Sequence, residues 1–243
     1  MAAPTSEVTR AARLVGAARC VLLDLDGPVT RLFPGDSWLE LSRQVRDAAV
    51  DAAAASGVAL ADTLSAALAD QRDHVQCLRI VAHHARELLP LVVDLVTRAE
   101  LDVARAAVAY PAAVRLIEET LARGAQVAVV TNNDPRVVGL VLERARAGLT
   151  ARLAGVHGRA PGTVDDLKPR PDLLLRGLVD AGCPPDAAVF LGDSVTDVQA
   201  GAAAGVVVIG VSEDATRREE LRAAGAVAVL PDLDPLTGPA RRA

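Results

Sequence analysis

The chain has 243 residues, enough for one sizeable domain or for a core domain with a smaller insert. Hydrophobic residues make up 51% and charged residues 23%, a globular composition that excludes an intrinsically disordered chain. The formal net charge of −5 argues against a broad basic surface, so we expect no nucleic-acid partner.

Three observations predict a cytoplasmic protein without membrane contact. Arginines interrupt the only N-terminal region that resembles a signal peptide. The longest uncharged stretch, 198–212, is broken by glycine and falls short of the roughly 18 apolar residues that a membrane span needs. Three cysteines lie far apart without a CxxC pair, as expected for reduced thiols: Cys20, Cys77 and Cys183.

The first predicted strand is the apolar run at 20–25, which stops at Asp26 and Gly27. Later apolar runs are also continuous, a pattern typical of buried parallel strands: 126–130, 187–191, 206–211 and 226–230. Helical patterns lie between these runs. The alternation predicts an α/β class with a Rossmann-like, doubly wound parallel sheet.

The segment 33–109 breaks the alternation, because it has helical patterns throughout and no convincing strand. We predict an all-helical cap domain here, inserted into an α/β core domain formed by 18–32 and 110–231. Residues 232–243 are expected to be a flexible tail, and the first dozen residues are expected to be frayed.

Several side chains of the insert invite a functional interpretation. Arg72, Arg79 and Arg86 recur every seven residues, and we interpret them as a solvated helix face rather than a basic stripe for an anionic substrate. Phe33 and Trp38 lie near the entrance of the insert. They could touch substrate, although a role in packing is at least as good an interpretation.

Carboxylates follow two of the predicted strands. Asp24 and Asp26 end the first strand, while Asp193 and Asp197 follow the strand at 187–191. Ligands of open parallel sheets bind outside the carboxyl ends of the strands, where one carboxylate can attack and another can handle protons. Three carboxylates in one crevice repel each other unless a cation is present, and hard oxygen ligands suit Mg²⁺.

Two further segments fit a phosphate site. Thr131 and Asn132 follow the strand at 126–130, where a hydroxyl and backbone N–H groups can hold phosphoryl oxygens. Lys168 lies in a proline-containing segment before a helix, and its ammonium can act as a point charge on phosphate. Each segment alone is an ordinary polar turn, but the four in this order are far more specific.

The sequence resembles the haloacid dehalogenase superfamily of hydrolases over roughly residues 20–230. The matching strings are DLDG at 24–27, VVTNND at 129–134, KPRPD at 168–172, GDSVTD at 192–197 and YPAAVRLIEETLARG at 110–124. The insert lies between the first and second strings, as in the helical-cap branch that includes phosphoglycolate phosphatase-like enzymes.

The resemblance implies a phosphatase that hydrolyses a small phosphorylated metabolite, acting as a monomer or homodimer. Asp24 would be the nucleophile that forms a phosphoaspartyl intermediate, and Asp26 would be the general acid and base. Thr131 and Lys168 would complete the catalytic set. The residues implied to bind phosphate are Leu25, Asp26, Thr131, Asn132 and Lys168.

The resemblance also implies Mg²⁺ as the cofactor. The ion would be held by the Asp24 carboxylate, the Asp26 backbone carbonyl and Asp193. Asp197 would hold a metal-bound water or Lys168.

Alternatives remain open at this point. Asp26 argues against dehalogenation, because a halide leaving group needs no proton. A phosphosugar mutase on the same core remains possible, as does a non-catalytic binding protein, although the four intact motifs argue against the latter. Position 28 is Pro where the superfamily usually has Thr or a small aliphatic residue, and we expect little effect on phosphate binding.

Overall fold

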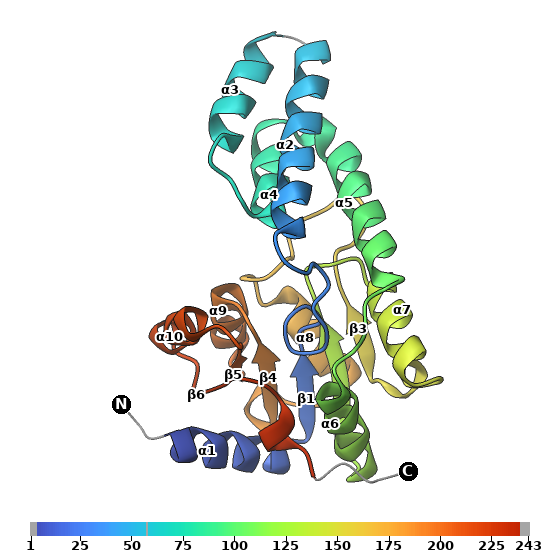
Figure 1. Cartoon of the computed structure of the whole chain (residues 1–243), viewed down its shortest axis with the longest axis vertical. Coiled ribbons are helices and arrows are strands. Elements are labelled where there is room, and N and C mark those ends of the chain that lie inside the picture. The colour runs from blue at the N-terminus through green and yellow to red at the C-terminus, as the bar shows by residue number, and fades with distance from the viewer. Residues whose placement is uncertain (1–3, 57, 239–243) are drawn as a thin grey trace.

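One six-stranded parallel sheet forms the centre of the molecule, and the computed structural model describes residues 4–56 and 58–238. The strand order is β3-β2-β1-β4-β5-β6, and the predicted α/β class is confirmed (Figure 1). The strands are β1 (Cys20–Leu23), β2 (Gln126–Val130), β3 (Gly155–His157), β4 (Ala188–Gly192), β5 (Val207–Val211) and β6 (Ala228–Leu230).

The register of the central strands sets the position of the predicted motifs. Leu23 at the end of β1 pairs with Val129 on one side and Leu191 on the other. All four residues of β1 are buried, as expected for a central strand covered on both faces. The residues that follow β1, β2 and β4 therefore meet at one edge of the sheet.

Helices cover both faces of the sheet. Contacts place α8, α9 and α10 on one face, and α1 and α6 on the other (Figure 1). Gly201 allows α9 to lie close to β5, because an added Cβ would come within 2.1 Å of the Val208 side chain. The helices outside the segment 33–109 are α1 (Pro4–Ala17), α6 (Pro111–Ala122), α7 (Arg136–Ala145), α8 (Asp172–Asp180), α9 (Val195–Ala204) and α10 (Ala215–Ala224).

Four helices stand together beyond the carboxyl ends of the strands (Figure 1). We refer to them as the cap helices: α2 (Ser37–Ser56), α3 (Val58–Leu68), α4 (His74–His84) and α5 (Leu89–Ala104). They pack through buried aliphatic side chains such as Val45, Leu78 and Val92. The described part of 33–109 contains no strand, in keeping with the helical pattern of its sequence.

Two elements differ from expectation. Strand β3 has three residues at the edge of the sheet and no apolar run, so its sequence carries little strand signal. Helix α1 covers residues that were expected to be frayed. It is held by an ion pair between Glu7 and Arg222 at 2.9 Å and by a hydrogen bond from Arg10 to the Val227 carbonyl.

Short 3-10 helices complete the fold: η1 (Arg86–Leu88), η2 (Thr150–Arg152), η3 (Pro185–Ala187) and η4 (Asp234–Leu236). The last lies in the predicted tail, where Asp234 pairs with Arg115 on α6 at 2.6 Å. Residues 239–243 of that tail lie outside the described residues.

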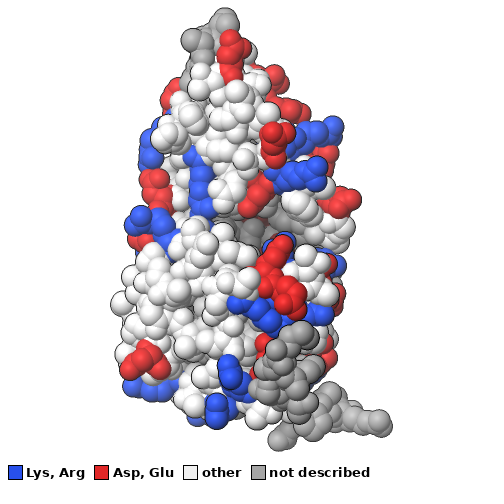
Figure 2. Space-filling view, turned by 90° about the vertical axis from the view of Figure 1, so that its left-hand side faces the viewer, with Lys and Arg blue, Asp and Glu red and all other residues white. Residues whose placement is uncertain are grey.

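Three structural features can be compared with the predictions made about membrane contact, cysteines and surface charge. None of the helices in the described ranges has the length and apolar character needed to cross a bilayer. All three cysteines are buried as free thiols. On the face shown in Figure 2, basic and acidic side chains are interspersed rather than gathered by sign.

Candidate active site

Lys168 lies at the centre of the polar cluster at the carboxyl edge of the sheet. Its ammonium is 2.9 Å from an Asp24 oxygen and 2.7 Å from an Asp197 oxygen, and it donates to the Val130 carbonyl. Only 2% of the Lys168 side chain is exposed, and the ring of Phe190 lies 5.5 Å from the ammonium. Burial alone would lower the Lys168 pKa, but Asp197 and Asp24 outweigh it and raise the pKa, which keeps the ammonium charged.

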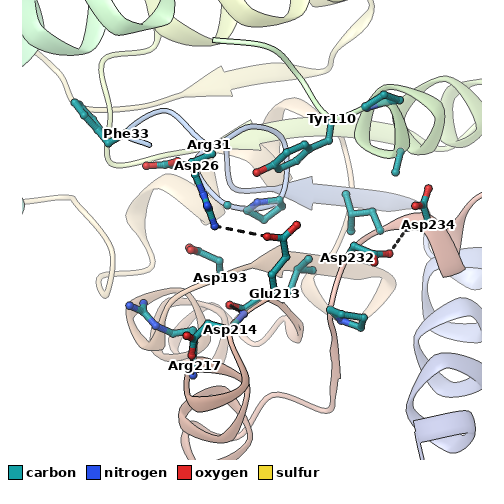
Figure 3. Close-up of a pocket in the computed structure, with 18 of the residues that line it drawn as sticks. Asp26, Arg31, Phe33, Tyr110, Asp193, Glu213, Asp214, Arg217, Asp232 and Asp234 are labelled. Atoms are coloured by element: carbon teal, nitrogen blue, oxygen red, sulfur yellow. Dashed lines mark hydrogen bonds and ion pairs between the residues drawn. The ribbon is translucent and has the colours of Figure 1, made fainter. Parts of the chain in front are cut away.

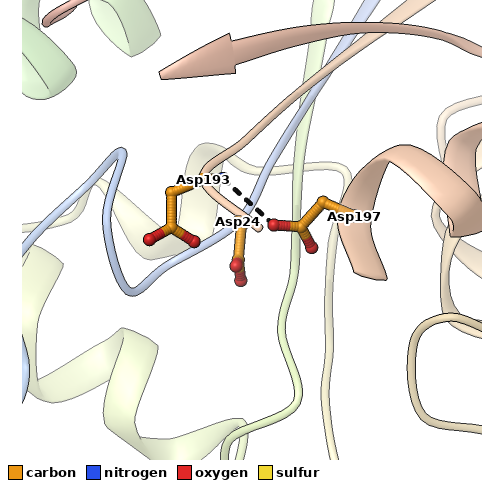
Figure 4. Close-up of side chains that lie close together, drawn as sticks. All are labelled: Asp24, Asp193 and Asp197. Carbon is orange, nitrogen blue, oxygen red and sulfur yellow. Dashed lines mark hydrogen bonds between the residues drawn. The ribbon is translucent and has the colours of Figure 1, made fainter. Parts of the chain in front are cut away.

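Asp24 lies directly after β1, with its carboxylate turned into the same cluster (Figure 4). It accepts a hydrogen bond from the Leu25 N–H at 2.7 Å. Burial raises the Asp24 pKa to about 7, with Asp197 adding to the rise and Lys168 opposing it. The carboxylate thus lies in a water-poor place where nearby positive charge decides its ionisation.

Asp193 completes a group of three carboxylates. Oxygens of Asp24, Asp193 and Asp197 all lie within 4.8 Å of one another (Figure 4). Burial and the neighbouring carboxylates raise the Asp193 pKa well above its usual range. Gly27 makes room for this side chain, because its φ is +103° and an added Cβ would lie 2.4 Å from the Asp193 carboxyl carbon.

Asp197 has a different environment from the other two carboxylates. One oxygen accepts from the backbone N–H groups of Asp193 and Ser194 and from the Ser194 hydroxyl, which closes a capping box at the start of α9. Its other oxygen faces Lys168. Asp197 is therefore already satisfied by donors, and its position fits a partner of Lys168 better than an open metal ligand.

Asp26 lies beside this cluster rather than within it. Its carboxylate accepts from the Leu32 N–H at 2.8 Å, at the start of the chain segment that leads into the cap helices. Burial raises the Asp26 pKa to about 6, opposed by the Leu32 hydrogen bond and Arg31. An aspartic acid with this pKa can carry a proton near neutral pH and give it up again.

The predicted phosphate-binding residues after β2 also reach this edge. The Thr131 hydroxyl is fully buried and donates to the Asn133 side chain at 2.8 Å. The Asn132 side chain accepts from the Lys168 N–H at 2.9 Å and donates to the Lys168 carbonyl at 3.1 Å. Asn132 therefore fixes the backbone that carries the lysine, a contact that the sequence did not indicate.

A buried ion pair links cap helix α5 to the loops that follow β2 and β3. Glu100 on α5 and Arg159 after β3 lie 2.6 Å apart, with side chains 0% and 1% exposed. Glu100 also accepts from the Asn133 side chain and the Asp134 N–H. Sequence reasoning missed both residues. One available signal was that Glu100 falls four residues after Val96 on the apolar stripe of α5.

A second contact joins α4 to the lysine segment. Arg79 donates to the Leu167 carbonyl at 3.2 Å and to the Lys168 carbonyl. The interpretation of Arg79 as part of a solvated helix face is therefore wrong, since the side chain is half-buried against the core. Arg86 does lie exposed, where it pairs with Asp165 at 2.6 Å.

Comparisons of sequence agree with this geometry. The sequence profile of the haloacid dehalogenase-like hydrolases matches residues 18–205. A phosphoglycolate phosphatase of Rhodospirillum rubrum is 31% identical over 224 residues, which cover 88% of this chain and 87% of that protein. One of Pseudomonas putida is 32% identical over 139 residues, which cover 54% of this chain and 50% of that protein.

Solved structures share the fold at lower identity. A hydrolase from Pseudomonas syringae has a TM-score of 0.60 at 22% identity, with 90% of this chain and 94% of that chain covered. A phosphonoacetaldehyde hydrolase-like protein from Oleispira antarctica has a TM-score of 0.64 at 17% identity, with 90% of each chain covered. By the matching sequence profile and a relative aligned over most of both chains, the chain belongs to the haloacid dehalogenase-like hydrolase family, in its phosphoglycolate phosphatase-like branch.

Proposed function

We propose that this hydrolase is a Mg²⁺-dependent phosphatase that acts on a small phosphorylated metabolite through a phosphoaspartyl intermediate on Asp24. The observation that carries the proposal is the buried bridge of Lys168 between Asp24 and Asp197, with Asp193 alongside. Phosphoryl transfer depends on positioning and on neutralising charge, and these groups supply both. The relatives named phosphoglycolate phosphatases support a phosphate monoester as the substrate.

The donors of the site fit a hard divalent cation. Three carboxylates lie together, and among the described residues the Lys168 ammonium is the cation that contacts them. Asp24, Asp193 and the Asp26 carbonyl would hold Mg²⁺, with Asp197 beside them as the partner of Lys168. The bound ion would neutralise charge on the phosphoryl oxygens.

In the first step an Asp24 oxygen attacks phosphorus and the bond to the leaving-group oxygen breaks. Asp26 gives its proton to that oxygen, and the alcohol departs. In the second step Asp26 takes a proton from water, and the water oxygen displaces Asp24 from phosphorus. Inorganic phosphate leaves and both carboxyl groups return to their starting state. Leu25, Thr131, Asn132 and Lys168 would hold the phosphoryl oxygens in both steps.

The proposal is tested by phosphate release from p-nitrophenyl phosphate with Mg²⁺ and with EDTA. We expect Asp24→Asn to lose at least about a thousandfold in kcat. Asp51→Asn on α2, an exposed aspartate, is the matched control and should keep its activity. Phosphate release that survives EDTA or the loss of Asp24 would contradict the proposal.

The role of Asp26 has its own test. An alkyl phosphate needs a proton on its leaving oxygen far more than p-nitrophenyl phosphate does. Asp26→Asn should therefore reduce alkyl phosphate hydrolysis by roughly a hundredfold or more, and p-nitrophenyl phosphate hydrolysis by much less. Equal losses would remove Asp26 from the role of acid.

A further inference from the structure

A large pocket opens beside the candidate catalytic acid. It has a volume of about 980 Å³ and lies between the segment that enters the cap helices and the loops that follow β5 and β6 (Figure 3). Asp26 and Asp193 form part of its wall. Asp24 does not line the pocket, but an oxygen of Asp193 on its wall lies within 4.8 Å of an Asp24 oxygen, so the pocket is next to the candidate nucleophile.

Aromatic side chains gather at this pocket. The chain has only two Phe, one Trp and one Tyr, and three of these four residues line the pocket: Phe33, Trp38 and Tyr110. The fourth, Phe190, lies by Lys168. Trp38 is 37% exposed, so part of its surface is open to a ligand. Aromatic faces of this kind bind rings by stacking and cations by their negative face.

The charged groups of the pocket also favour a ligand without negative charge beyond its phosphate. Each guanidinium that lines it lies within 4 Å of a carboxylate that also lines it: Arg31 with Glu213 at 3.8 Å, Arg115 with Asp234 at 2.6 Å, and Arg217 with Glu220 at 3.4 Å. Asp214 and Asp232 add further negative charge. Each described cation of the wall therefore has a carboxylate beside it, and the exposed Arg31–Glu213 pair is the weakest of the three.

We propose that this pocket receives the leaving group, and that the preferred substrate is a phosphate monoester of a neutral or cationic alcohol that carries a ring. The inference rests on the proposed phosphatase function. It sets this chain apart from its relatives named phosphoglycolate phosphatases, because glycolate is small, anionic and without a ring.

Size and charge both favour this class. Ligand pockets of roughly 300–1,000 Å³ suit molecules much larger than a two-carbon acid. A carboxylate in this pocket would face unpaired acids or would have to separate an existing ion pair, and opposed like charges are costly. A cationic or neutral group meets neither cost, and the exposed face of Trp38 would favour it.

Three esters of matched length test the charge. Their alcohols are glycolate, ethylene glycol and ethanolamine, which differ at the far end by a carboxylate, a hydroxyl and an ammonium. We expect kcat/KM for phosphoglycolate to be about tenfold or more below the values for 2-hydroxyethyl phosphate and phosphoethanolamine. A kcat/KM for phosphoglycolate that equals or exceeds the other two overturns the inference.

Two variants sharpen this test. Glu213→Gln frees Arg31 and should raise the ratio of phosphoglycolate to phosphoethanolamine turnover several-fold. Its control is Glu219→Gln on α10: Glu219 pairs with Arg222 and does not line the pocket, so this variant should leave the ratio unchanged. Trp38→Ala should lower the ratio of kcat/KM for benzyl phosphate over ethyl phosphate by about tenfold. Unchanged ratios in both variants overturn the assignment of the pocket.

The outcome separates this inference from the proposed function. If p-nitrophenyl phosphate is hydrolysed with Mg²⁺ and intact Asp24 but phosphoglycolate is the best of the three esters, only the inference fails. If no ester releases phosphate, the proposed phosphatase function fails with it.

Discussion

Three polar contacts between the segment 79–100 and the core differ in burial, and Arg86 of η1 makes one of them. The inner contacts are Glu100 with Arg159, and Arg79 with the carbonyls of Leu167 and Lys168. The outer contact is Arg86 with Asp165, whose side chains are each 60% exposed. Water and salt weaken the attraction within an exposed ion pair. When one partner of a buried pair is removed, the other charge stays buried without water or a counter-charge, which destabilises the fold.

Arg79 and Arg86 illustrate the difference between buried and exposed contacts. They are the same residue type, seven positions apart, and the sequence pattern does not distinguish them. One reaches the backbone of the candidate catalytic lysine, and the other pairs at the surface. Substitutions along the two groups of contacts should therefore differ by much more than the residue types suggest.

The largest effect is expected at Glu100. Glu100→Gln leaves the Arg159 guanidinium buried without a carboxylate and should cost roughly 3–5 kcal/mol in the free energy of unfolding. Urea titration measures it, and Glu87→Gln at an exposed position of η1 is the control. Replacing both partners, Glu100→Leu with Arg159→Met, should recover part of the loss but not all, because the Asn133 side chain and the Asp134 N–H still lose their acceptor. A single variant as stable as the control would contradict the importance of burial here.

The next effect is expected in catalysis. Arg79→Met removes the donor on the Lys168 carbonyl and lets the lysine backbone shift, so kcat should fall on the order of tenfold. The unfolding midpoint should change little by comparison with Glu100→Gln. Low concentrations of free guanidinium ion should restore part of kcat in this variant, and a fall in stability with unchanged kcat would oppose a positioning role.

A smaller effect is expected in the pH dependence of stability. His74, whose ring packs against Phe33, has a buried Nε2 without a partner. Burial lowers its pKa below 6.5, assisted by Arg159 and opposed by Glu100 and Asp73. The unfolded chain therefore binds this proton more tightly, so the contribution of His74 to stability should fall as the pH drops through about 6.5, while the raised pKa values of Asp24 and Asp26 act in the opposite direction.

Thermal unfolding between about pH 7.5 and 5.5 checks this expectation. The unfolding midpoint of His74→Gln should rise relative to that of the wild type as the pH drops, while that of His83→Gln, at an exposed position, should not. Parallel curves for the wild type and His74→Gln would remove His74 from this role.

The smallest effect is expected at the outer contact. Arg86→Ala breaks an exposed pair, so the unfolding midpoint and kcat should both stay within experimental scatter. A loss as large as that of Arg79→Met would erase the distinction between the inner and outer contacts.

The features that the sequence predicted correctly are those that depend on local sequence patterns. The α/β class and the parallel sheet are confirmed, because buried parallel strands have continuous apolar runs. Asp24, Thr131, Lys168 and Asp193 meet at one edge because that edge is where parallel strands end. Their roles and the metal ligands stay predictions until the variants are measured.

What the sequence did not reveal depends on tertiary contacts. Strand β3 is too short to carry a pattern, and α1 is held in place by partners more than two hundred positions away. Glu100 and Arg159 become a pair only when α5 lies against the loop after β3. The place of Glu100 on the apolar stripe of α5 could have marked it as buried, but local sequence does not name a partner 59 positions away.

Trp38 is the only tryptophan of the chain, and it lies partly exposed on the pocket beside Asp26. The intrinsic fluorescence of this protein therefore comes mainly from one place. Emission from a half-exposed indole shifts in wavelength and intensity when water around it is displaced. Ligand entry can thus be followed optically in the unmodified protein, including with compounds that are bound but never turned over.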